Sequence, residues 1–138
     1  MTNPNTSISR VSYRLLRGRP SPLVTVDLFH DHQQVNLEAY VDSGSYYSIF
    51  LADVAEALGI QVQAGRLTYL AGSHGQFFAL HLDRVGIRIA DHRFTSEVGF
   101  SSQSWIGFNL LGRYSIFNQL RFCFDDRHNV LDISQYHG

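Results

Sequence analysis

The sequence contains no lysine, since all eleven of its basic residues are arginine. Enzymes that form a Schiff base with their substrate and nucleotide-binding proteins with a P-loop both depend on a lysine amine, so these two classes are excluded. Cys123 is the only cysteine, and the chain can therefore form neither an internal disulfide bond nor a thiolate zinc cluster. A reducing, cytoplasmic setting is expected.

An excess of charge of one sign is also lacking. The net charge is −1, the isoelectric point is near 6.6, and the arginines are scattered along the chain. We therefore expect no nucleic acid partner and no membrane partner. No apolar run approaches the roughly 20 residues that span a bilayer, and residues 1–10 lack the features of a signal or transit peptide.

The length and composition indicate a single domain. A chain of 138 residues, of which 44% are hydrophobic, is long enough to bury one core. No internal repeat, low-complexity tract or Pro/Ser-rich linker divides the sequence. We expect residues 1–10 to form a flexible tail and residues 11–138 to form the domain.

Short runs of aromatic and β-branched residues, separated by Gly, Asp, His and Asn, predict a mainly β fold. The predicted hairpins cover residues 22–41, 66–82, 84–100 and 120–133. Their turns are expected at residues 31–34, 72–75, 90–93 and 125–129. One short helix is predicted at 51–58, with Gly59 as its stop. These elements together predict a small closed or nearly closed β-barrel.

The stretch "AYVDSGSYYSIF" places a single acid, Asp42, at the end of an apolar run. Taken alone, Asp42, Ser43 and Gly44 form a common turn, because short polar side chains cap backbone amides and glycine accepts positive φ. The apolar residues on both sides favour a turn that lies inside the fold. Asp42 is therefore a candidate functional acid.

The local pattern resembles the active-site loop of retropepsin-like aspartic peptidases. In that family two apolar residues precede Asp, then Thr or Ser, Gly, Ala or Ser, two variable residues, and Ser or Thr. Residues 40–48 follow this order. A second family element, two apolar residues and a glycine about 70 positions later, looks like Leu110, Leu111 and Gly112. The predicted helix at 51–58 and the segment 69–78 also lie where the family has a helix and a flap hairpin.

The resemblance implies a closed barrel of the retropepsin-like acid protease type and the hydrolysis of peptide bonds in extended polypeptide substrates. Such chemistry needs two carboxylates that share a proton and activate a water molecule. The chain has only one sequence of this type, so the second acid is expected to be Asp42 of another copy in a homodimer. No metal and no cofactor is expected.

The resemblance also assigns roles to the neighbours of the catalytic Asp42. Ser43 would hydrogen-bond across the dyad, Gly44 would permit close approach of the partner loop, and Ser45 would donate to the outer oxygen of Asp42. Leu110, Leu111 and Gly112 would support the loop from below. The expected flap, which would close over the substrate, consists of Ala71, Gly72, Ser73, His74, Gly75 and Gln76.

One position departs from the family pattern. Retroviral members often have an acid two positions after the loop glycine, able to pair with an arginine that follows the second glycine. Tyr46 occupies that position here. Arg113 therefore needs a different partner.

Several alternatives to the peptidase hypothesis remain. The leading one is a dimeric peptide-binding module of the same fold with weak or absent catalysis, because a fold does not fix a function. A nucleophilic Ser43 is rejected, since the flanking glycines of serine proteases are missing. The residues His30 to His32 are expected in a solvated turn rather than at a metal site. Asp125 and Asp126 are expected in a hairpin turn.

Overall fold

The computed structural model describes residues 8–71, 74–102 and 107–136, and it is built around a closed barrel of six strands. Each strand pairs with the next, and the last strand, β8, pairs with the first, β4, which closes the barrel. The order around the barrel is β4 (Leu23–His30), β5 (Gln33–Val41), β10 (Asn109–Leu111), β6 (Ile49–Leu51), β9 (His92–Ser101) and β8 (Phe77–Ile89). The predicted mainly β, closed barrel is confirmed.

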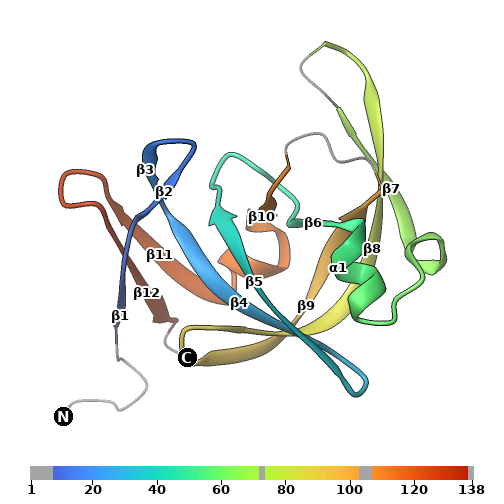
Figure 1. Ribbon diagram of the computed structural model, residues 1–138, viewed down its shortest axis with the longest axis horizontal. Helices are drawn as coiled ribbons and strands as arrows, with labels where there is room; N and C mark the ends of the chain where they lie inside the picture. The colour runs from blue at the N-terminus through green and yellow to red at the C-terminus, as the bar shows by residue number, and fades with distance from the viewer. Residues whose placement is uncertain (1–7, 72–73, 103–106, 137–138) are drawn as a thin grey trace.

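Three smaller assemblies of strands surround the barrel (Figure 1). Strand β7 (Arg66–Ala71) pairs with β8 and forms with it a hairpin that projects at the upper right of the figure. A three-stranded sheet and a short hairpin lie on the left. The sheet consists of β1 (Ser9–Ser12), β12 (Val130–Gln135) and β11 (Leu120–Asp125), in that order. The hairpin consists of β2 (Arg14–Leu16) and β3 (Arg19–Ser21).

The described residues begin within the expected tail, at residue 8. Ser9 and Arg10 belong to β1 and pair with Ile133 and Asp132 of β12. The Arg10 side chain also donates hydrogen bonds to both carboxylate oxygens of Asp132. Residues 1–7 lie outside the described residues. The domain therefore includes residues that the sequence alone did not distinguish from the tail.

The single predicted α-helix is confirmed as α1 (Ala52–Ala57). As expected, the helix stops before Gly59, whose φ of +72° suits glycine better than other residues. Two short irregular helices follow, η2 (Val62–Ala64) and η3 (Arg113–Phe117). Over the residues that the structure describes, no helix has the length and apolar character needed to cross a membrane.

The predicted hairpins at 66–82 and 84–100 share one long strand. Strand β8 runs without a break from Phe77 to Ile89, so it pairs with β7 at one end and with β9 along most of its length. Its buried residues have even numbers up to Leu82 and odd numbers from Val85 onward. In the sequence, this change from even to odd apolar positions at Asp83 and Arg84 resembles a boundary between two strands. In the structure it is one strand that buries one face before this point and the opposite face after it.

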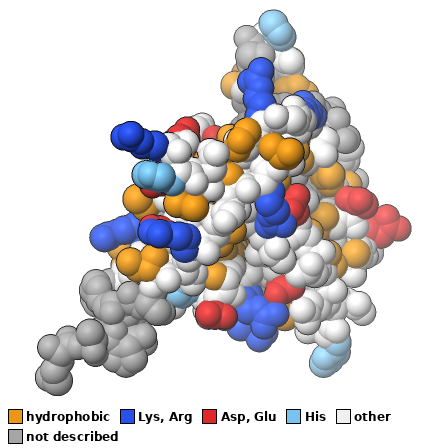
Figure 2. Space-filling model, turned by 60° about the vertical axis from the view of Figure 1, so that its left-hand side comes forward, with side chains coloured by type: hydrophobic (Ala, Val, Ile, Leu, Met, Phe, Trp, Pro, Cys, Tyr) orange, Lys and Arg blue, Asp and Glu red, His pale blue; other side chains and the backbone are white. Residues whose placement is uncertain are grey.

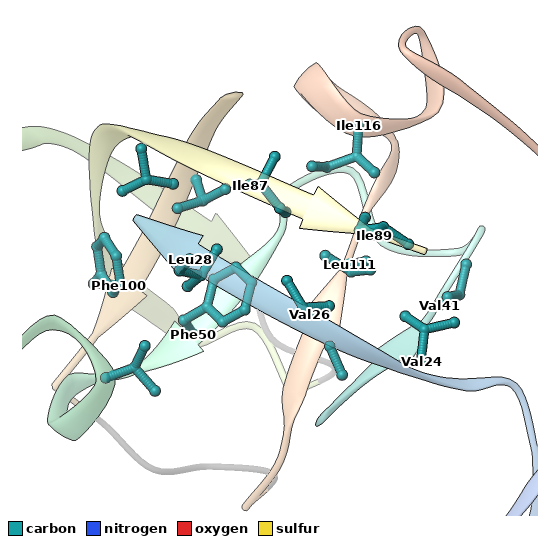
Figure 3. Packing of buried hydrophobic residues seen from close by; sticks show 14 of the residues in the cluster. Val24, Val26, Leu28, Val41, Phe50, Ile87, Ile89, Phe100, Leu111 and Ile116 are labelled. Carbon is teal, nitrogen blue, oxygen red and sulfur yellow. The ribbon is translucent and has the colours of Figure 1, made fainter. Parts of the chain in front are cut away.

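Two apolar clusters result from this arrangement. The main core fills the barrel and includes the side chains labelled in Figure 3, which come from β4, β5, β6, β8, β9, β10 and η3. A second cluster lies on the β7 side and contains Ile49, Leu80, Leu82 and Leu110. On the face shown in Figure 2, charged side chains of both signs are interspersed with apolar ones. The second cluster places apolar side chains directly beneath the loop that follows β5.

A largely buried acid on β4 gives a testable contribution to stability. Asp27 accepts a hydrogen bond from Asn36 at 2.8 Å and two from Arg88, at 2.9 and 2.5 Å. These bonds, from Asn36 first and then from Arg88, lower the pKa of Asp27 below its ordinary value of 3.8. We expect Asp27→Ala to reduce the free energy of unfolding in urea by about 2 kcal/mol at neutral pH.

The same measurement at low pH provides the control. Because the folded-state pKa is lowered, the carboxylate stabilises the fold above pH 3.8 and loses this effect as the pH falls through the lowered pKa. The difference between wild type and Asp27→Ala should therefore shrink in acid. A difference that stays constant from pH 7 to acid would show that the ionised carboxylate contributes nothing.

Candidate active site

Asp42 stands at the end of β5, where the chain leaves the barrel. Its backbone N–H donates to the Leu111 carbonyl at 2.9 Å, which fixes the start of the loop on β10. Asp42 Oδ1 accepts the Gly44 N–H at 2.9 Å, and the Ser45 N–H donates to the Asp42 carbonyl at 3.2 Å. The loop backbone therefore orients the carboxylate.

Strand β10 supports this loop from below. Leu110 pairs with both Tyr40 and Ile49, and Leu111 pairs with Val41, so β10 lies between the two strands that flank the loop. Leu110 and Leu111 are buried. These two residues thus join the loop to both apolar clusters.

Gly112 makes the closest approach to the loop. A Cβ atom at this position would lie 2.2 Å from the Tyr47 carbonyl oxygen and 2.9 Å from the Ser45 carbonyl oxygen, so no other side chain fits. The Gly112 N–H donates to the hydroxyl of Ser48, which is 1% exposed, at 2.9 Å. The Arg113 N–H donates to the Ser45 carbonyl at 2.9 Å. The N–H groups of Gly112 and Arg113 therefore bind the loop to the chain that follows β10.

Two hollows flank Asp42, one on each side of the loop. In Figure 1 the loop lies between the β2–β3 hairpin and the β7–β8 hairpin. The β7 hollow, of about 280 Å³, is lined by Asp42, Gly44, Ser45, Tyr46, Ile49, Leu70, Ala71 and Leu110. The β2–β3 hollow, of about 380 Å³, is lined by Tyr13, Pro20, Pro22, Tyr40, Val41, Asp42, Ser43, Phe124 and Asp126. Asp42 is therefore accessible from both sides.

The prediction that the Ser45 hydroxyl donates a hydrogen bond to Asp42 is wrong. The Ser45 hydroxyl donates instead to the Tyr47 carbonyl at 2.7 Å. The Gly44 N–H is the donor to Asp42 Oδ1. Ser45 stabilises the fold of the loop, whereas Gly44 orients the acid. Ser43 is exposed and lines the β2–β3 hollow.

The expected flap falls at the end of the β7–β8 hairpin. Ala71 is the last residue of β7 and lines the β7 hollow beside Asp42. His74, Gly75 and Gln76 are exposed in the turn, where the His74 N–H donates to Gln76 Oε1 at 3.1 Å and Gly75 has a φ of +80°. Gly72 and Ser73 lie outside the described residues.

The partner of Arg113 is Tyr46, which stands at the position of the acid expected from the resemblance. The Arg113 guanidinium lies over the ring of Tyr46, 5.6 Å from the ring centre. Within the described part of the chain it makes no ion pair. A cation–π contact with Tyr46 thus stands in place of the ion pair that the resemblance to retroviral members implied.

This contact predicts a small and selective effect on stability. Tyr46→Phe should leave the free energy of unfolding unchanged, because the ring face that attracts the cation remains. Tyr46→Leu should lower it by about 0.5–1 kcal/mol, measured by urea denaturation. Equal stability of the two variants would show that the cation–π contact contributes nothing.

Sequence reasoning missed two residues around the loop. Glu97 of β9 accepts hydrogen bonds from Arg66 at 2.5 Å and from the Tyr114 hydroxyl at 2.9 Å. The Tyr114 N–H donates to the Tyr46 carbonyl at 2.7 Å. No local signal in the sequence indicates that these distant segments meet at Glu97.

The other polar clusters singled out in the sequence lie at or beside turns. His30 Nδ1 lies 3.2 Å from the Leu58 carbonyl, and His32 is exposed in the turn after β4. Asp125 accepts hydrogen bonds from the His128 N–H and Nδ1 in the turn between β11 and β12. Over residues 8–71, 74–102 and 107–136, no three His, Cys, Asp or Glu side chains are grouped as metal ligands.

Comparison with known proteins connects this geometry with a fold. No protein-family profile matches the sequence, and no curated protein matches it. A retropepsin-like aspartic protease from Rickettsia conorii superposes with a TM-score of 0.61 at 17% identity, over 96% of each chain. The EIAV protease, solved with an inhibitor bound, superposes with a TM-score of 0.53 at 17% identity, over 72% of this chain and 88% of that one. The chain therefore has the fold of the retropepsin-like aspartic proteases.

Proposed function

We propose that the protein is an aspartic endopeptidase that is active as a homodimer, with one Asp42 from each subunit. The observation that carries the proposal is the position of Asp42. It directly follows Val41, the buried last residue of β5, its carboxylate is oriented by the Gly44 N–H, and it is open to a hollow on either side. A purely structural acid at a turn would not need access from two sides.

The chemistry requires a second acid, and the dimer supplies it. Two carboxylates that approach each other cannot both remain ionised, so the pair holds one proton near its working pH. The ionised acid then takes a proton from a water molecule, which attacks the peptide carbonyl, while the protonated acid donates its proton to the carbonyl oxygen. Ser43 is exposed beside Asp42, where it would meet the partner loop.

Asp126 is the other acid that lines a hollow with Asp42, but its surroundings do not favour a catalytic role. Its Oδ1 accepts the Tyr13 hydroxyl at 2.7 Å. Burial, followed by this hydrogen bond, raises the pKa of Tyr13, so the phenol keeps its proton and stays a donor to Asp126. Asp126 therefore serves to join the β11–β12 turn to the segment after β1.

The β7 hollow is the proposed binding site for the substrate. Apart from Asp42 and Ser45 its side chains are apolar or aromatic, and the Ser45 hydroxyl is already bonded to the loop backbone. An extended peptide could add backbone hydrogen bonds along the hairpin while its side chains enter the hollow. Ala71 and the turn that contains His74, Gly75 and Gln76 would lie over it as a flap.

The test is cleavage of a peptide library by the purified protein, read by mass spectrometry at several pH values and protein concentrations. A dyad predicts a bell-shaped dependence of kcat/KM on pH, whose limbs belong to the pair. Activity per subunit should rise with protein concentration, because dilution separates the dimer. A stable dimer that binds peptides at all pH values and cleaves none would instead support the peptide-binding module.

A further inference from the structure

Glu97 accepts hydrogen bonds from two different elements, β7 and η3. Arg66, the first residue of β7, places Nη2 at 2.5 Å from Glu97 Oε1, and the Tyr114 hydroxyl of η3 donates to the same oxygen at 2.9 Å. The Glu97 side chain is only 21% exposed, against 60% for Arg66. Glu97 is thus a partly buried acceptor shared by β7 and η3.

The contacts continue from Tyr114 to the loop that carries Asp42. The Tyr114 ring centre lies 5.4 Å from that of Tyr46 and 5.6 Å from that of Tyr47. The Tyr114 N–H also donates to the Tyr46 carbonyl at 2.7 Å. Because Tyr46 lines the β7 hollow, a continuous series of contacts runs from Glu97 to one wall of that hollow.

The opposite wall of the hollow belongs to β7. Leu70 and Ala71, at the end of this strand, line the hollow beside Asp42. In the sheets that the structure describes, β7 is an edge strand that pairs with β8. An edge strand opens more easily than a central one. The bond from Arg66 to Glu97 crosses β8 and holds β7 to β9 by a side chain.

Glu97 is charged at neutral pH. The hydrogen bond from Arg66, with a further one from Tyr114, lowers the pKa of Glu97 although partial burial opposes this. Arg84, opposite Glu97 on β8, acts in the same direction. The charge strengthens both hydrogen bonds.

We propose that Glu97 is a positioning residue for the proposed cleavage reaction. It fixes the separation between β7 and the Tyr46 wall, and so determines how firmly an extended peptide is held beside Asp42. This inference rests on the function proposed above. Glu97 acts through Arg66 and Tyr114 and touches no reacting atom. Its loss should therefore weaken substrate binding and leave the hydrolytic step nearly unchanged.

Steady-state kinetics of three variants test this role. Glu97→Ala should raise KM about tenfold with kcat within about threefold of wild type, as expected for lost binding rather than lost chemistry. Tyr114→Phe should shift KM in the same direction by a smaller factor. Glu97→Gln should recover part of the loss, since its amide oxygen still accepts from Tyr114. The matched control is Glu38→Ala, which removes another arginine–glutamate pair, with Arg14, away from the hollow.

Hydrogen exchange provides a measurement that does not depend on activity. The β7 amides should exchange about tenfold faster in Glu97→Ala than in wild type or Glu38→Ala. Unchanged exchange together with an unchanged KM would overturn the inference. If Glu97→Ala does not fold, Glu97→Gln and Tyr114→Phe give the same comparison.

A cleavage assay and a binding assay distinguish failure of the proposed function from failure of the inference about Glu97. If the wild-type protein cleaves no peptide, the function is wrong, and the inference is decided by binding of a fluorescent apolar peptide to Asp42→Asn. Adding Glu97→Ala to that variant should raise the Kd for the peptide about tenfold if Glu97 positions the wall of the hollow. An equal Kd would contradict it.

Discussion

Asp42→Asn should abolish peptide cleavage, with kcat/KM reduced by a factor of about 10³ or more, while the protein stays folded and dimeric. The asparagine side chain has nearly the same shape, and its carbonyl oxygen can still accept the Gly44 N–H that orients Asp42 Oδ1 at 2.9 Å. An amide cannot take a proton from water or share one with a second acid. The loss should therefore appear in kcat/KM and not in the urea midpoint or in the sedimentation of the dimer.

Asp126→Asn is the matched control for this result. Asp126 lines the β2–β3 hollow together with Asp42, but it is engaged by the Tyr13 hydroxyl. We expect this variant to keep the activity of the wild type within about threefold, because it removes no member of the proposed dyad. Equal loss in both variants would indicate an acid pair within one chain and would contradict the homodimeric mechanism.

Gly112→Ala should destabilise the fold by about 3 kcal/mol or more. The added Cβ would lie 2.2 Å from the Tyr47 carbonyl oxygen and 2.5 Å from its carbonyl carbon, and both are backbone atoms that cannot turn away. The loop must then move off β10, which would also displace Asp42, so activity should fall together with stability. Urea denaturation and kcat/KM measure the two effects.

Gly59→Ala separates this steric effect from backbone strain. Gly59 has a φ of +72° and no atom within 4 Å of an added Cβ, whereas Gly112 has a φ of −104°, which every residue adopts. Gly59→Ala should cost about 1 kcal/mol, from strain alone, and leave catalysis unchanged. If Gly112→Ala costs no more than Gly59→Ala, the loop is not held as tightly as the contacts indicate.

Features that depend on short stretches of sequence could be predicted. Alternation, turn residues and a helical stop at Gly59 predict the hairpin of β4 and β5, the helix α1 and the closed barrel. The resemblance to retropepsin-like peptidases, which rested on residues 40–48 and 110–112, is confirmed for the fold by the superpositions. The catalytic role of Asp42 and the dimer stay predictions.

Features that depend on contacts between distant segments could not be predicted. Strand β8 changes its buried face at Asp83 and Arg84, because two apolar clusters lie on opposite sides of the sheet. The Ser45 hydroxyl turns to the Tyr47 carbonyl because the loop curls back on itself. The meeting of Arg66, Glu97 and Tyr114 joins three segments whose spacing along the chain carries no recognisable pattern.

The most direct test of the central claim is the activity of mixed subunits. Wild-type and Asp42→Asn protein are combined in equal amounts, allowed to exchange subunits, and assayed at constant total concentration. If both Asp42 side chains act in one site, random pairing leaves only about a quarter of the full activity, since the mixed dimer is inactive. Retention of about half of the activity would contradict the account, because each wild-type chain would then act without the acid of its partner.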